Sequence, residues 1–135
     1  MRVAEIMQPN VKSVHRDSSV TEAITLMAEE HVSGLPVVDD QGRVVGVIST
    51  TDILQAESEW VGPNRGDLID HTPVRELMTP RPLMVAPDAT IREVAQQMLY
   101  GEVHRLFVEA GGRMVGVVTQ TDIVRALANT RAGVE

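Results

Sequence analysis

The chain contains no cysteine among its 135 residues. This absence excludes a disulfide scaffold, a thiolate zinc site and a cysteine nucleophile. Its aromatic residues are one Trp, one Tyr and one Phe, too few for a platform on which single-stranded bases stack. No uncharged stretch approaches the ~20 apolar residues that a membrane span needs, and residues 1–10 do not combine a basic start with an apolar run. We therefore expect a cytoplasmic protein without a membrane partner.

The charge balance is acidic, with 12 basic residues, 19 acidic residues and a net charge of −7. A nucleic-acid surface needs a basic stripe that replaces counterions, so this balance argues against nucleic acid as a partner. It does not exclude a small anion, because one or two well-placed arginines are enough to hold a phosphate. The chain is 43% hydrophobic and 23% charged, which is typical of a single globular domain with an aliphatic core.

An internal repeat dominates the sequence. Residues 3–56 align with residues 74–126 with a one-residue gap near positions 39–41. Identical residues recur along the whole unit, and they include the following pairs: Val3 and Val74, Met7 and Met78, Pro9 and Pro80, Leu35 and Leu106, Gly46 and Gly116, Thr51 and Thr121, Asp52 and Asp122. A repeat of this length indicates one supersecondary unit present twice.

Each unit predicts the order strand, helix, hairpin, helix. A hydroxyl three residues before a carboxylate, at Ser19 and Glu22 and again at Thr90 and Glu93, is the capping-box pattern of a helix start. Apolar runs at 35–38 and 44–48, and at 106–108 and 114–118, are joined by glycine-bearing turns and predict two hairpins. A last helix is expected to begin at Thr50 and at Gln120, with Ser49 and Thr119 as its caps.

These patterns predict an α/β (α+β) fold with two repeats, each a small three-stranded sheet packed with two helices. Since a unit of this size buries too little surface alone, we expect the two sheets to pack about a pseudo-twofold axis. The predicted organisation is repeat 1 at 1–56, a linker at 57–73, repeat 2 at 74–128 and a C-terminal tail at 129–135. A loop within the linker is predicted from four turn-favouring residues, Gly62, Pro63, Asn64 and Gly66.

The repeat resembles the CBS domain pair, also called the Bateman module, over about residues 1–128. The resemblance rests on Met-x-Pro at Met7 and Met78, on the segment Val-Ser-Gly-Leu-Pro-Val that begins at Val32, and on two closing motifs. The closing motifs are Gly-Val-Ile-Ser-Thr-Thr-Asp from Gly46 and Gly-Val-Val-Thr-Gln-Thr-Asp from Gly116. The resemblance implies a regulatory module that binds adenosine-containing ligands in clefts between the repeats and signals to a partner by reorientation.

The closing motifs have two interpretations. Hydroxyl-x-x-Asp is itself a capping pattern, which is the simpler explanation of Ser49 with Asp52 and of Thr119 with Asp122. The N–H groups and positive dipole end of such a helix also suit a phosphate, and an ionised Asp accepts two hydrogen bonds at once, as a ribose diol requires. The family resemblance implies that the Asp holds the ribose, so we expect a combined cap and ligand role.

The resemblance implies a stronger site around Arg105, which follows His104 where repeat 1 has Ser33 and Gly34. A planar guanidinium clamps phosphate oxygens, and the His-Arg pair is similar to that of AMP-sensing relatives; a solvated basic pair on a strand edge is the alternative. The predicted stronger site comprises these residues: Lys12, Val32, Ser33, Arg105, Thr119, Thr121 and Asp122.

The twin cleft is expected to be weaker, because Gly34 stands where the first has Arg105. An empty twin cleft is an equal alternative. The predicted weaker site comprises these residues: Ser49, Thr51, Asp52, Leu83, Val103 and His104.

No catalytic residue is predicted. The chain lacks a nucleophile elbow, a phosphate loop ending in Lys-Ser/Thr and a His-Glu-x-x-His motif, and the twin Asp residues suit two binding sites better than one acid–base pair. The histidines show no metal-ligand spacing. AMP, ADP or ATP is the expected regulatory ligand, with S-adenosylmethionine or NAD as alternatives, and we expect a homodimer that regulates an unknown protein partner. A structural dimerisation module with an empty or vestigial cleft is the competing hypothesis.

Overall fold

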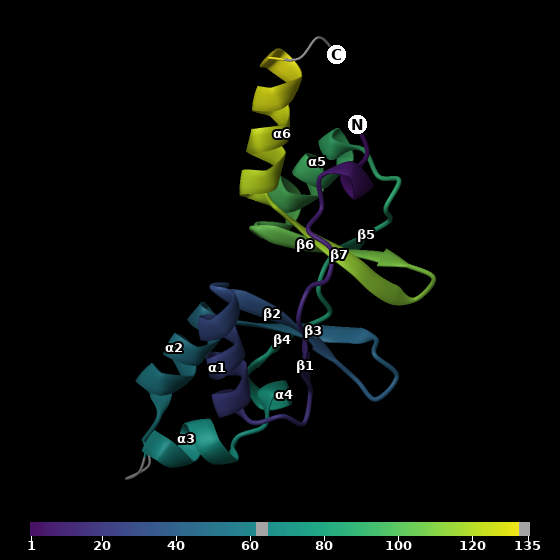
Figure 1. Cartoon of the computed structure of the whole chain (residues 1–135). Coiled ribbons are helices and arrows are strands. Elements are labelled where there is room, and N and C mark those ends of the chain that lie inside the picture. Colours follow the sequence, from purple (N-terminus) through teal and green to yellow (C-terminus); the bar gives the residue numbers. More distant parts are fainter. Residues whose placement is uncertain (62–64, 133–135) are drawn as a thin grey trace. The chain divides into compact units, whose positions relative to one another are not determined.

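The computed structural model describes residues 1–61 and 65–132, which form two compact units (Figure 1). Unit 1 consists of Met1–Val11 together with Leu83–Glu135, and unit 2 consists of Lys12–Pro82. Each unit therefore carries the opening segment of one sequence repeat and the body of the other.

Unit 2 is a four-stranded sheet with the strand order β1-β2-β3-β4, and helices α1 and α2 contact strands β2 and β3. Strand β1 runs parallel to β2, whereas β2 with β3 and β3 with β4 are antiparallel. The elements are β1 (Val14–His15), α1 (Val20–Glu30), β2 (Gly34–Val38), β3 (Val44–Ser49), α2 (Thr50–Glu59), α3 (Arg65–His71), α4 (Val74–Leu77) and β4 (Thr79–Pro80).

Unit 1 repeats this plan with a three-stranded sheet of order β5-β6-β7, contacted by α5 and α6. The N-terminal segment takes the place of β4, because Gln8 forms a single antiparallel bridge with Val117 of β7. The elements are the 3-10 helix η1 (Val3–Glu5), β5 (Met84–Val85), α5 (Ile91–Gly101), β6 (Arg105–Ala110), β7 (Arg113–Thr119) and α6 (Gln120–Ala132).

The predicted order of strand, helix, hairpin and helix is confirmed in both units. The predicted N-caps are confirmed as well: Ser19 Oγ accepts the Glu22 N–H at 3.3 Å, and Thr90 Oγ1 accepts the Glu93 N–H at 3.1 Å. An N-cap of this kind satisfies a backbone donor that has no partner inside the helix.

The opening segments are exchanged between the two repeats. Val3, from the start of repeat 1, is fully buried in the core of unit 1, and its N–H donates to the Ala89 carbonyl at 2.8 Å. Val74, from the start of repeat 2, is fully buried in the core of unit 2, and its N–H donates to the Ser18 carbonyl at 2.7 Å. The sequence repeats at 1–56 and 74–128 are thus not the compact units of the fold.

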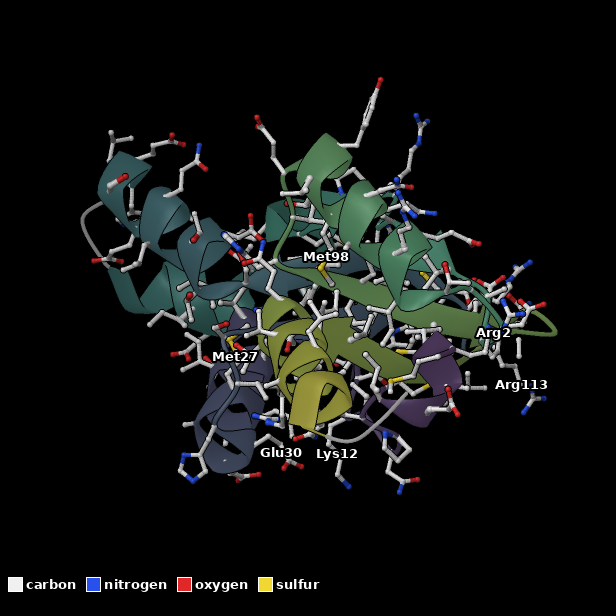
Figure 2. All side chains as sticks on the ribbon, turned by 90° about the horizontal axis from the view of Figure 1, so that it is seen from above. Arg2, Lys12, Met27, Glu30, Met98 and Arg113 are labelled. Carbon is white, nitrogen blue, oxygen red and sulfur yellow. The ribbon has the colours of Figure 1, made fainter. Side chains whose placement is uncertain are left out.

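Each core is aliphatic and includes one buried methionine, at equivalent positions of α1 and α5. Met27 is 6% exposed and Met98 is 2% exposed, and Figure 2 labels both on their helices. The flexible thioether fills the space between a helix and a sheet of β-branched side chains. The same figure shows the Lys12 side chain extending away from the fold.

The linker prediction is wrong at Gly66, which lies in helix α3 (Arg65–His71) rather than in a loop. Helix α3 contacts α1, and Thr21 Oγ1 of α1 donates to Asp70 Oδ1 at 2.7 Å. This tertiary contact outweighs the weak helix propensity of glycine. Gly62, Pro63 and Asn64 lie outside the described residues.

Two further predictions need correction. Helix α6 continues to Ala132, into the segment 129–135 predicted as a tail. The sheet of unit 2 has four strands instead of three, because β4 pairs with β3 through Thr79 and Val47. Among residues 1–61 and 65–132, no helix combines the length and apolar character needed to cross a membrane.

Candidate functional site

Asp122 and Thr119 cap the start of α6 through reciprocal hydrogen bonds. The Thr119 N–H donates to Asp122 Oδ2 at 2.9 Å, and the Asp122 N–H donates to Thr119 Oγ1 at 3.2 Å. Asp122 is 5% exposed and is the one buried charged residue among those described. The first of the two interpretations, a helix cap, is therefore confirmed for this motif.

Asp52 makes the same arrangement at the start of α2. The Ser49 N–H donates to Asp52 Oδ2 at 2.9 Å, the Ser49 hydroxyl donates to the same oxygen at 3.0 Å, and the Asp52 N–H donates to Ser49 Oγ at 3.2 Å. In both units the cap uses mainly Oδ2, so Oδ1 is the oxygen that faces other partners.

A second contact to each aspartate was not predicted. The Gln8 side-chain amide donates to Asp122 Oδ1 at 3.2 Å and lies 3.5 Å from Oδ2. The Thr79 hydroxyl donates to Asp52 Oδ1 at 3.2 Å. Gln8 and Thr79 are the middle residues of the two Met-x-Pro motifs, and a polar side chain at x in both copies was the available signal.

Arg105 begins β6 directly opposite Thr119 of β7. Partial burial lowers the pKa of the Arg105 guanidinium. This pKa still lies far above neutral pH, so the side chain keeps its charge. Gly34 occupies the equivalent position opposite Ser49 in unit 2. The register therefore confirms that the two repeats differ by an arginine against a glycine at this place.

The entrances of β6 and β2 are tied to the helix starts. In unit 1 the Gln120 N–H donates to the His104 carbonyl at 3.1 Å, and the Gln120 side chain donates to the Val103 carbonyl at 3.4 Å. In unit 2 the Thr50 N–H donates to the Ser33 carbonyl at 2.9 Å. These bonds hold the backbone of the predicted site residues beside the N-terminal turns of α6 and α2.

The structure divides each predicted site between the units. Of the stronger site, unit 1 holds Arg105, Thr119, Thr121 and Asp122, and unit 2 holds Lys12, Val32 and Ser33. Of the weaker site, unit 2 holds Ser49, Thr51 and Asp52, and unit 1 holds Leu83, Val103 and His104. The exposed residues of the two predicted sites are Lys12, Val32, Ser33, Thr51, Leu83, His104 and Thr121. That the residues of unit 1 and unit 2 together form each binding site stays a prediction.

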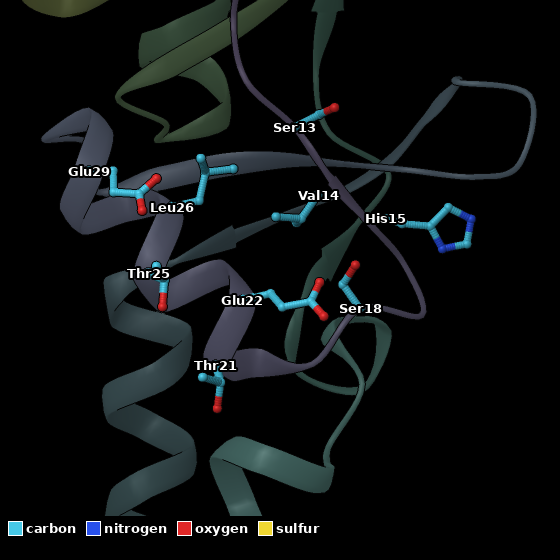
Figure 3. Close-up of a pocket in the computed structure, with 9 residues that line it drawn as sticks. All are labelled: Ser13, Val14, His15, Ser18, Thr21, Glu22, Thr25, Leu26 and Glu29. Atoms are coloured by element: carbon cyan, nitrogen blue, oxygen red, sulfur yellow. The ribbon is translucent and has the colours of Figure 1, made fainter.

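A pocket of about 400 Å³ lies within unit 2, over β1 and the outer face of α1 (Figure 3). Ser13, His15, Glu22 and Glu29 are among its lining residues, and none of the predicted site residues belongs to it. Across residues 1–61 and 65–132, no group of three or more His, Asp or Glu side chains is arranged to hold a metal ion.

The model of the CBS domain matches residues 3–59 and 74–129. Because these two segments cover most of the chain, the protein belongs to the CBS domain family and carries the domain twice. This confirms the resemblance inferred from the Met-x-Pro starts and the closing motifs.

Two curated relatives are longer than this chain. CBSX2, a chloroplastic CBS domain-containing protein of Arabidopsis thaliana, is 33% identical over an alignment of 148 positions, which covers 92% of this chain and 62% of CBSX2. MJ1225 of Methanocaldococcus jannaschii is 28% identical over 127 residues, which are 94% of this chain and 43% of MJ1225. The chain thus spans about half the length of these relatives.

Two solved structures share the fold and contain adenosine compounds. The structure of CBSX2 in complex with AMP has a TM-score of 0.81 and 33% identity, covering 96% of this chain and 98% of that one. The CBS domain pair of MJ0100, in complex with 5′-methylthioadenosine and S-adenosyl-L-methionine, has a TM-score of 0.82 and 25% identity, with coverage of 96% and 98%.

Proposed function

We propose that this chain is a regulatory module without catalysis of its own, which binds an adenosine-containing ligand of the AMP, ADP or ATP class. S-adenosylmethionine and NAD are the alternative ligands. The observation that carries the proposal is the pair of equivalent aspartates, Asp52 and Asp122, each held at a helix start beside a strand entrance. The AMP complex of CBSX2 supports the ligand class.

In the proposed stronger site, unit 1 supplies the polar half. Asp122 accepts the ribose hydroxyls, and Arg105 pairs with phosphate oxygens through its planar fork. Thr119 and Thr121 add hydroxyls at the start of α6, where the helix dipole favours negative charge. Lys12, Val32 and Ser33 of unit 2 complete the adenine side when the halves join.

In the proposed weaker site, Ser49, Thr51 and Asp52 face Leu83, Val103 and His104. Gly34 opposite Ser49 provides no cation where Arg105 provides one. A phosphorylated ligand therefore binds this site less tightly than the first, and a ligand with less charge is preferred.

Signalling to a partner follows from the division of each site between two units. A ligand that contacts both units stabilises one of their relative orientations, and it shifts the equilibrium only by its differential affinity for the two. A partner that contacts both units then reads the change. The ligand acts as a regulator, and it is neither consumed nor converted.

We also propose that the chain forms a homodimer, as the family resemblance implies. Several large apolar side chains are exposed on the helices, among them Leu54 of α2 (68%), Leu99 of α5 (77%) and Val124 of α6 (64%). A second copy would remove such surface from water. Sedimentation velocity at micromolar concentration tests this, and a monomer throughout would contradict it.

The competing function is a structural dimerisation module. It is favoured by the helix caps that Asp52 and Asp122 form, since a structural role needs no more than these bonds.

Calorimetric titration with AMP, ATP, S-adenosylmethionine and adenosine separates the two. We expect micromolar binding of a phosphorylated ligand, and we expect Asp122→Asn to weaken it about tenfold or more, because two charge-assisted hydrogen bonds are lost. Asp88→Asn makes the same charge change at an exposed residue of unit 1 and serves as the control. No heat and no thermal stabilisation with any ligand would favour the structural module.

A further inference from the structure

The middle residues of the Met-x-Pro motifs donate to the aspartates that the proposed function assigns to ribose. Gln8 and Asp122 are separated by 114 positions along the chain, yet their side chains are 3.2 Å apart. Thr79 and Asp52 repeat the contact at 3.2 Å with a different side chain and a separation of 27 positions. Two independent copies of one contact, made by unlike residues, point to a role that both units share.

The acceptor capacity of Asp122 shows what this contact does. A carboxylate oxygen offers about two lone-pair positions. Asp122 Oδ2 accepts from the Thr119 N–H at 2.9 Å, and Oδ1 accepts from Arg125 Nη1 at 3.4 Å. The Gln8 amide donates to Oδ1 at 3.2 Å and lies 3.5 Å from Oδ2. A ribose diol brings two further hydroxyl donors. With the Thr119 N–H kept on Oδ2 and Arg125 kept on Oδ1, each oxygen has room for one ribose hydroxyl only after the Gln8 amide leaves.

We propose that Gln8 and Thr79 occupy acceptor positions on Asp122 and Asp52 that a ribose hydroxyl needs, so that each side chain competes with the ligand for its aspartate. These side chains are then specificity-determining residues that set the affinity of each site for a ribose diol. The inference rests on the proposed function, because it concerns the ligand contact of the same aspartates.

The surroundings of Gln8 allow such a displacement without unfolding. Its side chain is exposed, while its backbone is held to β7 by hydrogen bonds with Val117 of 2.8 and 3.0 Å. The amide can therefore rotate into solvent while the main chain stays in place. Thr79 is shorter and β-branched, and it lies within the strand pair β3–β4, so its hydroxyl can turn but cannot withdraw.

This difference makes the two sites unequal. Gln8 leaves Asp122 at the cost of one hydrogen bond, which water replaces. Thr79 stays beside Asp52 and continues to compete with the ligand. The inequality acts in the same direction as the replacement of Arg105 by Gly34, and both favour the Asp122 site.

The test compares Gln8→Met with the parent chain in titrations with AMP and with 2′,3′-dideoxy-AMP. Methionine keeps the length of glutamine and removes its donor. We expect AMP to bind about two- to tenfold more tightly to the variant, since a competing hydrogen bond has been removed. We expect 2′,3′-dideoxy-AMP to be unaffected, because it lacks the hydroxyls that take over the acceptor.

Two variants accompany this comparison. Gln96→Met makes the same chemical change at an exposed position of α5 and should leave both affinities unchanged. Thr79→Val removes the hydroxyl beside Asp52 without changing shape, and it should strengthen AMP binding at the second site. It also keeps the inference testable if Gln8→Met fails to fold.

The outcomes are distinct. If the parent chain binds AMP, and both Gln8→Met and Thr79→Val bind AMP with unchanged or weaker affinity, this inference alone is overturned. Equal gains for AMP and for 2′,3′-dideoxy-AMP also overturn it, because the effect would not depend on the diol. If the parent chain binds no adenosine compound, the proposed function fails and this inference fails with it.

Discussion

A Cβ atom on Gly116 would lie 2.6 Å from Sδ of Met7 and 3.0 Å from the carbonyl oxygen of Gln8. Gly46 has the same relation to unit 2, where a Cβ would lie 2.5 Å from Sδ of Met78 and 2.9 Å from the Thr79 carbonyl oxygen. The methionine of each Met-x-Pro motif therefore packs over the glycine that opens the closing motif, and residue x reaches the aspartate that ends it. The two motifs form one contact surface in each unit.

Gly116→Ala should destabilise the chain by about 1–3 kcal/mol, because the added methyl group overlaps a neighbouring side chain and a backbone oxygen. Urea denaturation followed by circular dichroism measures the loss. Met7→Ala removes the sulfur contact, so the double variant should lose less than the sum of the two single variants. An unchanged midpoint in Gly116→Ala would show that Met7 moves aside freely.

Because the opening segments are exchanged between the repeats, a core substitution in the opening segment of one repeat should destabilise the unit built mainly from the other. Val3→Ala should destabilise unit 1, and Val74→Ala should destabilise unit 2, each by about 2 kcal/mol, because each leaves a void in a fully buried position. Hydrogen exchange with mass spectrometry locates the effect. We expect faster exchange in β6 and β7 for Val3→Ala, and in β2 and β3 for Val74→Ala. The reverse pattern would contradict the placement of Val3 in unit 1 and of Val74 in unit 2.

Asp39 predicts a pH dependence of stability. The Arg43 N–H donates to Asp39 Oδ1 at 3.0 Å in the β2–β3 turn, and this bond holds the pKa of the Asp39 carboxyl below its usual value. A carboxyl with a lower pKa in the folded state stabilises the fold above its unfolded pKa, and it loses this contribution as the pH falls through the folded value.

Asp39→Asn should therefore be less stable than the parent chain at neutral pH, and the difference should shrink as the pH falls below the usual carboxyl range. Thermal melts from pH 7 to about pH 3 follow it. Asp88→Asn provides the matched control at an exposed carboxylate. A difference that stays constant over this range would rule out an ionised Asp39 as its origin.

Arg105→Ala should weaken AMP or ATP binding more than adenosine binding, because the guanidinium is assigned to the phosphate. The loss for a phosphorylated ligand should be about tenfold, as expected for one charge-assisted contact. Arg113→Ala, at the exposed start of β7, is the control for the change in net charge. Equal losses for phosphorylated and bare ligands would remove Arg105 from the phosphate position.

The sequence was sufficient for features that depend on nearby residues. Ser19 with Glu22 and Ser49 with Asp52 are separated by three positions, so their caps follow from helix geometry. The hairpins follow from apolar runs and glycine turns. The repeat itself, with the family that it indicates, is a property of the sequence and needs no coordinates.

Tertiary structure decided the features that depend on residues far apart. Val3 packs in the core of unit 1 and not with the repeat that it begins, and Gln8 donates to an aspartate 114 positions away. Gly66 lies in a helix because α3 contacts α1. Local propensity and periodicity say which face of an element is apolar, but they do not say which of two equivalent surfaces will cover it. In a chain made of two similar repeats, that choice is made by packing alone.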